Sequence, residues 1–223
     1  MITVHHLNNS RSQRILWLLE ELGLDYEIKK YQRDAKTMLA PPELRAIHPL
    51  GKSPVITDGD TMVAESGAII EYLIEHYGHG KFVPAFGTPD KLRYTYFMHY
   101  AEGSAMTPLL MKLVFDKVET SPMPFFVKPI AKGIAQKVKK TYIMPQILQH
   151  LKYLESELAT RTWFAGEAFS GADIQVSFVL EAASARGGLG DKYPKLFDFL
   201  KRIHARPAYQ RALERGGKYE LIK

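Results

Sequence analysis

Segments with a strand-like pattern are confined to the first 65 residues, and this uneven distribution constrains the fold of the 223-residue chain more than any other feature. The strand patterns occur at residues 2–7, 26–31, 55–57 and 62–64. The last two flank Asp58-Gly59-Asp60-Thr61, which is a strong hairpin signal. From residue 89 onward no convincing strand pattern follows, so the sequence predicts an N-terminal sheet and an all-helical remainder.

Helical patterns separate these strands. Apolar residues recur at helical spacing from Ile15 to Leu22, and Gly23 stands where a C-terminal cap belongs. Shorter helical patterns follow Pro41 and begin at Ser66. The order is therefore β-α-β-α-β-β-α, in which the first two strands should be parallel and joined by a right-handed crossover. This is the thioredoxin-like α/β arrangement.

The boundary between the two parts is marked by Gly and Pro. Residues 78–89 contain three Gly and two Pro, and we predict an α/β domain over 1–79, a linker over 80–88 and an all-α domain over 89–223. The first long helix should start at Thr88-Pro89-Asp90, with a hydroxyl cap and an early acid, and break around 121–124. Further helices are expected over about 127–158, kinked near Pro145, and from near Ser170, Pro194 and Pro207.

Charge is divided between the same two parts. Residues 1–80 carry 8 Lys/Arg and 11 Asp/Glu, a net −3, whereas residues 81–223 carry 22 and 13, a net +9. The basic charge is too dispersed to predict nucleic-acid binding. Residues 125–140 hold five lysines and no acid. This segment fits either a solvated helix face or an amphipathic surface for a membrane or a partner.

The chain has no cysteine, which excludes disulfides, thiolate metal sites and a cysteine nucleophile. Neither a signal peptide nor an apolar run of membrane-spanning length is apparent. These features predict a cytoplasmic protein without a membrane span. His5 and His6 are adjacent in a predicted strand and should point to opposite faces, so we expect no metal site.

The segment from His48 to Val55 carries the first chemical pattern. Pro54 opens an apparent strand inside a compact sheet, where a proline needs a positional reason. A cis Ser53–Pro54 bond would expose the N–H and C=O of Val55 for strand-like pairing with an extended peptide ligand. The alternative is an ordinary turn into the strand.

The second pattern is Glu65-Ser66 at a strand-to-helix junction. The helix N-terminus and the Ser66 hydroxyl could hold a carboxylate, and Glu65 could pair with an ammonium group. Together they suit the α-amino-acid end of a γ-glutamyl group. An ordinary helix cap is the alternative.

The third pattern lies at the start of the first helix, around Asn8 to Arg14. A serine hydroxyl here could donate a hydrogen bond to a thiolate, which the helix dipole also favours.

In this order and at this spacing, the patterns resemble the cytosolic glutathione S-transferase family over nearly the whole chain. The resemblance is closest to the branch shared by bacteria and fungi. It rests on the segments from Ser10 to Glu21, from Arg33 through Ala40 to Leu44, from His48 to Pro54, and on Phe169 to Ile174, where Ser170 and Asp173 are structural in the family.

The resemblance implies a division of labour in binding glutathione. Pro54 would be cis, and Val55 would pair with the cysteinyl backbone. Glu65 and Ser66 would hold the γ-glutamyl group, and Lys52 and His48 would reach the glycyl carboxylate.

Members of the family use a tyrosine, serine or cysteine near the end of the first strand. No cysteine exists and no tyrosine lies between residues 1 and 25, so Ser10 is our expected catalytic residue, with Asn9 and Ser12 as alternates. Without a cysteine, thioltransferase chemistry has no nucleophile. This favours thiolate addition or substitution, or hydroperoxide reduction by bound glutathione.

An apolar electrophile pocket should be built by the long helix after the linker. Its candidates are Tyr100, Met106, Leu110 and Phe115, each of which could instead be an ordinary helix-packing residue. The expected protein is a detoxifying transferase that uses glutathione as co-substrate, attacks small hydrophobic electrophiles and holds no permanent cofactor or metal. The resemblance also implies a homodimer. The alternative function is a non-catalytic binding or scaffold protein that keeps the fold.

Overall fold

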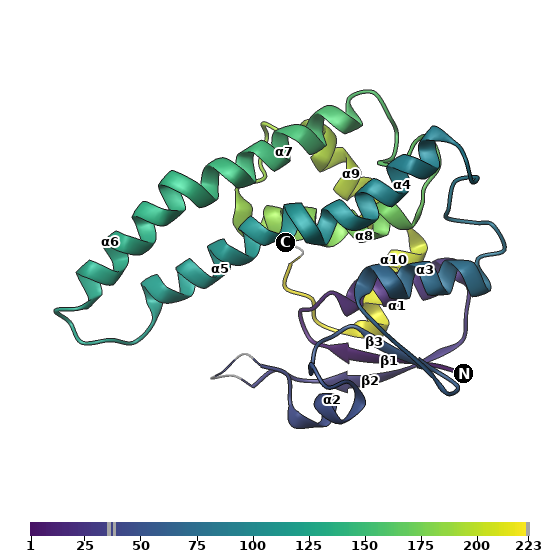
Figure 1. Cartoon of the computed structure of the whole chain (residues 1–223), viewed down its shortest axis with the longest axis horizontal. Helices are drawn as coiled ribbons and strands as arrows, with labels where there is room; N and C mark the ends of the chain where they lie inside the picture. Colours follow the sequence, from purple (N-terminus) through teal and green to yellow (C-terminus); the bar gives the residue numbers. More distant parts are fainter. Residues whose placement is uncertain (35–36, 38, 222–223) are drawn as a thin grey trace.

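The computed structural model describes residues 1–34, 37 and 39–221, and its N-terminal part is built on one mixed sheet (Figure 1). The strands follow the order β2-β1-β3-β4, with β1 and β2 parallel and β3 antiparallel to both β1 and β4. Their bounds are β1 Ile2–Leu7, β2 Tyr26–Tyr31, β3 Val55–Asp58 and β4 Thr61–Ala64. The predicted parallel pair and the hairpin are both present.

Three helices accompany this sheet: α1 Ser12–Leu22, α2 Pro42–Ile47 and α3 Ser66–Tyr77. α1 and α3 lie between the sheet and the helical part of the molecule, and α2 lies on the other side of the sheet (Figure 1). Gly23 caps α1 in the left-handed conformation at φ 67°, which a residue with a Cβ adopts at a cost. The residues of α1 from Ile15 to Leu19 are apolar and buried. They belong to one hydrophobic cluster with residues of the sheet and of the helical part.

A connection without helix or strand leads from Tyr77 to Pro89, across the proposed linker. After it, the described residues form no further strand. Their helical elements, three of which are π-helical turns (η), are α4 Pro89–Tyr100, η1 Ala101–Ala105, α5 Met106–Thr120, α6 Lys128–Val138, η2 Lys139–Ile143, α7 Met144–Leu158, α8 Gly171–Ala182, η3 Ala183–Gly187, α9 Pro194–His204 and α10 Pro207–Gly216. The predicted fold class, a thioredoxin-like domain followed by a helical domain, is confirmed.

α8 is the central helix of the second part. Each of its twelve residues is buried, and it packs against α1, α3, α4 and α9. Residues of both parts therefore share one hydrophobic cluster, which continues from β1 and α1 through α8 into α9. Because α1 packs on α8 and α10 as well as on β1, the start of α1 is held from both sides.

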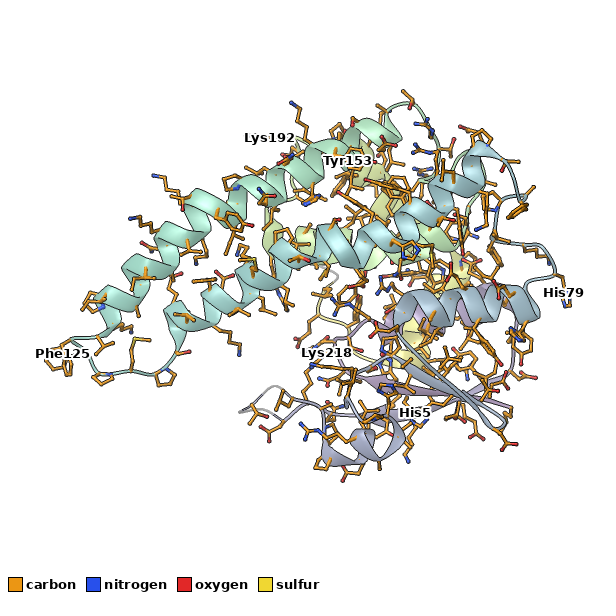
Figure 2. The ribbon with its side chains drawn as sticks, in the orientation of Figure 1. His5, His79, Phe125, Tyr153, Lys192 and Lys218 are labelled. Atoms are coloured by element: carbon orange, nitrogen blue, oxygen red, sulfur yellow. The ribbon has the colours of Figure 1, made fainter. Side chains whose placement is uncertain are left out.

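α5 and α6 form a hairpin that projects from the body of the molecule (Figure 1). Phe125 lies at its tip, as Figure 2 shows, and its side chain is 87% exposed. α6 packs chiefly against α5 and against the turn η2 that follows it. Within the described ranges, no helix combines the length and the apolar character that crossing a bilayer requires.

Candidate active site

Three sequence patterns meet at one end of the strands of the sheet. β1 ends at Leu7, β3 begins at Val55 and β4 ends at Ala64. Val55 is opposite His5 on one side and Ala64 on the other, so Ser53-Pro54 and Glu65-Ser66 lie at the edge from which the chain leaves β1 toward Ser10. The register of the sheet thus brings together residues that are up to 56 positions apart in the sequence.

Ser10 lies in the turn between β1 and α1, and its residue is 4% exposed. Its hydroxyl oxygen accepts the Ser12 backbone N–H at 3.2 Å and lies 2.7 Å from the Ser12 hydroxyl oxygen. Ser12 is 0% exposed, so it lies behind Ser10 as seen from solvent.

Asn9, the other alternate, is occupied by the C-terminal segment. Its amide nitrogen donates to the Glu220 carboxylate at 3.0 Å, and its amide oxygen accepts the Glu220 backbone N–H at 2.9 Å. Lys218, labelled in Figure 2, marks this segment where it passes the first domain. The Asn9 side chain is thus bound to the C-terminal segment through its oxygen and one of its two N–H groups.

Ser12 also contacts a histidine. Its hydroxyl oxygen lies 2.9 Å from Nδ1 of His6, which is buried at the end of β1. Burial, with a smaller contribution from the Lys30 charge, lowers the pKa of His6 to about 4, so the ring is neutral at pH 7. His5 turns to the other face and pairs with the Tyr31 hydroxyl at 2.9 Å.

A charge cluster stands beside the start of α1. Glu102, on the turn η1, lies 2.5 Å from the buried Arg14 and 2.9 Å from Nε of Arg11. Burial tends to raise the pKa of Glu102, but the two arginines outweigh it and the pKa lies below its ordinary value. Two cations face one carboxylate here, so these three side chains together carry a net positive charge. Arg11 also lies over the Phe178 ring, 5.1 Å from its centroid.

The Ser53–Pro54 peptide bond is cis, as expected. β3 is flanked by β1 and β4, so the Val55 peptide groups face neighbouring strands. A strand inside a sheet has no open edge, so the expected contact of Val55 with a peptide ligand stays a prediction. Ser53 precedes the first residue of β3 by two positions and lies outside the sheet. Its hydroxyl oxygen is 3.4 Å from the hydroxyl oxygen of Ser10.

Glu65 and Ser66 stand at the start of α3. Glu65 is exposed, and its backbone adopts φ 73° and ψ 128°, a conformation that non-glycine residues rarely take. Ser66 is buried at the first position of the helix, where backbone N–H groups point outward. This arrangement can accept an anion at the helix start while the Glu65 carboxylate is available to a cation.

Lys52 and His48 flank the same edge. Lys52 is exposed, whereas His48 is half-buried and its Nδ1 is buried without a hydrogen-bond partner. Gly51 between them has φ 56°, and a Cβ there would lie 2.6 Å from the Arg45 side chain. The turn therefore needs glycine to present Lys52 to solvent.

The four electrophile-pocket candidates do not share one environment. Tyr100 is buried and its hydroxyl lies 2.6 Å from Nδ1 of His150 on α7, which fits the packing alternative. Leu110 is 52% exposed, while Met106 is buried and Phe115 packs against the core. Glu102 and Phe178 both contact Arg11, directly before α1.

Sequence reasoning missed His6, Arg14 and Glu102. Glu102 meets the two arginines from about 90 positions away, and only the packing of η1 on α1 brings them together. Arg14 gave one available signal, because it is a cation directly before the apolar run from Ile15 to Leu19, and a buried cation needs a partner.

Comparison with known proteins shows the family of the chain. Residues 1–75 match the glutathione S-transferase N-terminal domain, and residues 114–207 match the C-terminal domain. The chain is 35% identical to glutathione S-transferase 1 of Saccharomyces cerevisiae, over 97% of this chain and 95% of that protein. It is 37% identical to glutathione S-transferase 3 of Schizosaccharomyces pombe, over 96% of this chain and 88% of that protein. A crystal structure of a glutathione S-transferase from Actinobacillus pleuropneumoniae superposes with a TM-score of 0.79 at 36% identity, covering 99% of this chain and 95% of the other.

Proposed function

This chain belongs to the glutathione S-transferase family, and from that premise we propose that it activates glutathione with Ser10 as the thiolate-stabilising hydroxyl. Its function is that of a glutathione transferase, with glutathione as the co-substrate. The observation that carries the assignment of the site is the meeting of Ser10, Ser53 and Glu65-Ser66 at one sheet edge.

The thiolate is stabilised by position and charge. A sulfur atom beside Ser10 would accept a hydrogen bond from the Ser10 hydroxyl. It would lie at the N-terminal end of α1, where the helix dipole is positive. Arg11 and Arg14 add a net positive charge that Glu102 only half neutralises. Each of these contributions favours the anionic sulfur over the thiol and lowers its pKa.

The tripeptide itself is held by the surrounding edge. The α3 N-terminus and Ser66 would bind the γ-glutamyl carboxylate, and Glu65 would bind the ammonium group. The peptide groups of Ser53 would pair with the cysteinyl unit. Lys52 and His48, at the far side of the turn, would bind the glycyl carboxylate.

The reaction is thiolate attack on a small hydrophobic electrophile, with reduction of hydroperoxides by bound glutathione as a second reaction of the same thiolate. No cysteine is present to form a mixed disulfide, so disulfide exchange lacks its nucleophile. The rival function, a non-catalytic scaffold with this fold, would not require the Glu65-Ser66 edge. Met106 and Phe115 remain candidates for the electrophile pocket, joined now by Phe178.

We also propose a homodimer in the cytoplasm. The net −3 of residues 1–80 and the net +9 of residues 81–223 are complementary if each N-terminal domain meets the helical domain of a second copy. The absence of cysteine is compatible with a reducing compartment.

Calorimetry with glutathione tests the site. Glu65→Ala is expected to weaken binding at least tenfold, because the ligand's ammonium group loses its charged partner. Glu75→Ala, an exposed glutamate on the same helix, is the matched control and should bind as the unaltered protein does. No detectable binding by the unaltered protein at millimolar glutathione would end the enzymatic assignment.

Ser10→Ala tests the catalytic residue. The pKa of the bound thiol should rise by about one unit, as expected for one lost charge-assisted hydrogen bond, while glutathione affinity changes little. Turnover at pH 6.5 should fall several-fold to tenfold. If Asn9→Ala moves the pH–rate profile and Ser10→Ala does not, the donor is Asn9.

A further inference from the structure

Behind Ser10 lies a chain of hydrogen bonds that the binding of glutathione does not by itself require. Nδ1 of His6 lies 2.9 Å from the Ser12 hydroxyl oxygen, which lies 2.7 Å from the Ser10 hydroxyl oxygen. All three residues are buried. Both distances are typical of good hydrogen bonds, so the three groups form one connected unit.

Each hydroxyl in this chain has one hydrogen to donate, so the chain has a direction. If Nδ1 carries no hydrogen, Ser12 donates to His6, and the Ser10 hydrogen is drawn inward to Ser12. If Nδ1 carries the hydrogen, His6 donates to Ser12, and Ser12 donates to Ser10. Only in the second case is the Ser10 hydrogen left for a ligand.

No other neighbouring group sets the direction of the Ser10 hydroxyl hydrogen. Ser10 already accepts the Ser12 backbone N–H at 3.2 Å. The Ser53 hydroxyl donates to the His5 carbonyl at 3.0 Å, so its hydrogen is committed elsewhere. The Leu7 carbonyl could take the Ser12 hydrogen, but at 3.4 Å it is a much weaker partner than Ser10 at 2.7 Å. The direction of the chain therefore depends mainly on His6.

We propose that His6 is a positioning residue: in its Nδ1–H form it donates to Ser12, which donates to Ser10, so that the Ser10 hydrogen points at the glutathione sulfur. The inference rests on the proposed role of Ser10 and extends it to the residues behind it. No proton is transferred, and the chain only sets the direction of three hydrogen bonds.

The surroundings of His6 suit this role. Lys30 lies opposite His6 on the neighbouring strand, and its charge disfavours a second proton on the ring. The ring is therefore neutral at pH 7 and carries a single hydrogen on its nitrogens. A thiolate at Ser10 favours the outward direction, because only that direction supplies it with a donor. Binding of the anion and the Nδ1–H form of His6 therefore stabilise each other.

The test measures the pKa of the bound glutathione thiol, from thiolate ultraviolet absorbance against pH, in single and double variants. His6→Leu and Ser12→Ala should each raise this pKa by about half a unit to one unit, with kcat near pH 6.5 lowered and glutathione affinity almost unchanged. His6→Asn should restore most of the effect, because its amide nitrogen follows Cγ as Nδ1 does and can donate to Ser12.

Double variants separate this inference from the role of Ser10. In the Ser10→Ala background, His6→Leu should add nothing, since the residue through which it acts is gone. An undiminished shift there would overturn the chain, and so would a normal thiol pKa in both His6→Leu and Ser12→Ala. If Ser10→Ala itself leaves the pKa unmoved, the proposed function of Ser10 fails first. Should His6→Leu not fold, Ser12→Ala with and without Ser10→Ala decides the same question.

Discussion

Glu65 stores conformational energy in its backbone. A non-glycine residue at φ 73° and ψ 128° costs about 1–3 kcal/mol and persists only where its surroundings hold it. Its exposed side chain makes no compensating cap to the helix that follows. The site therefore keeps a glutamate here at the expense of stability, as expected if the carboxylate is needed for a ligand.

Substitution at Glu65 should separate binding from stability. Glu65→Gly relieves the strain at an entropic cost of about 0.5–1 kcal/mol, whereas Glu65→Ala keeps the strain. We expect Glu65→Gly to melt a few degrees above Glu65→Ala, as about 1 kcal/mol does in a chain of this size, while both bind glutathione weakly. Thermal unfolding without ligand measures the difference. Equal melting temperatures would mean that the backbone of Glu65 is not strained.

His6 should also make stability depend on pH. Because its pKa falls from the ordinary 6.5 to about 4 on folding, the unfolded chain binds the proton more readily between these values. Its contribution is complete above pH 6.5 and is lost as the pH falls toward 4, on the order of 2–3 kcal/mol. Urea unfolding across this window should show a smaller pH dependence in His6→Asn. The exposed His79→Asn is the control and should keep the original dependence.

At the scale of elements, α8 and α4 begin with side-chain caps in different environments. The fully buried Asp173 accepts the backbone N–H of Phe164 at 2.9 Å and of Ser170 at 2.8 Å. At α4, the Thr88 hydroxyl accepts the Lys91 N–H at 3.2 Å near the surface. The buried cap joins α8 to the preceding loop, whereas the cap of α4 is local.

Removing each cap should therefore cost different amounts. Asp173→Ala leaves two buried N–H groups without an acceptor and should lower the free energy of unfolding by about 3 kcal/mol. Thr88→Ala should cost about 1 kcal/mol. Denaturant unfolding compares them, and turnover per folded molecule should be normal in both. A selective loss of turnover in Asp173→Ala would mean that Asp173 also serves the site.

The elements that sequence predicted best are those with local signals. Gly23 ends α1, Pro89 opens α4 and the Asp58–Thr61 turn joins β3 to β4. The kink expected near Pro145 is a π-helical turn, η2, immediately before α7, because a proline lacks the N–H and crowds the preceding turn. The similar turn η1 before Pro108 went unpredicted, although Pro108 offers the same local signal.

The parts of the site that sequence did not predict depend on long-range packing. Ser10 and the Glu65-Ser66 pair stand at element starts and are visible in the sequence. The contacts of His6 with Ser12 and of Glu102 with Arg14 require the side-chain directions of β1, α1 and η1 in three dimensions. For the same reason helical spacing alone could not predict the contact of the Tyr100 hydroxyl with His150 on α7.

At the scale of the whole molecule, the division of charge makes the oligomeric state measurable. A homodimer that pairs the −3 part of one copy with the +9 part of another should be seen by light scattering at micromolar concentration. Raising the salt concentration should weaken it, because the attraction is screened. A single species of 25.3 kDa would contradict the proposal.

The projecting hairpin of α5 and α6 has a consequence for how the molecule opens. Its outer helix packs chiefly on α5, and Lys139, the η2 residue directly after α6, forms ion pairs with Asp116 and Glu119 on α5. Amide hydrogens of α6 should therefore exchange with solvent through a local opening, at a free energy well below that of α8, which exchanges only when the molecule unfolds. Lys139→Ala should speed exchange along α6 and leave α8 unchanged. Mass spectrometry of deuterium uptake would then find one chain with two stabilities, a rigid centre and a hairpin that opens independently.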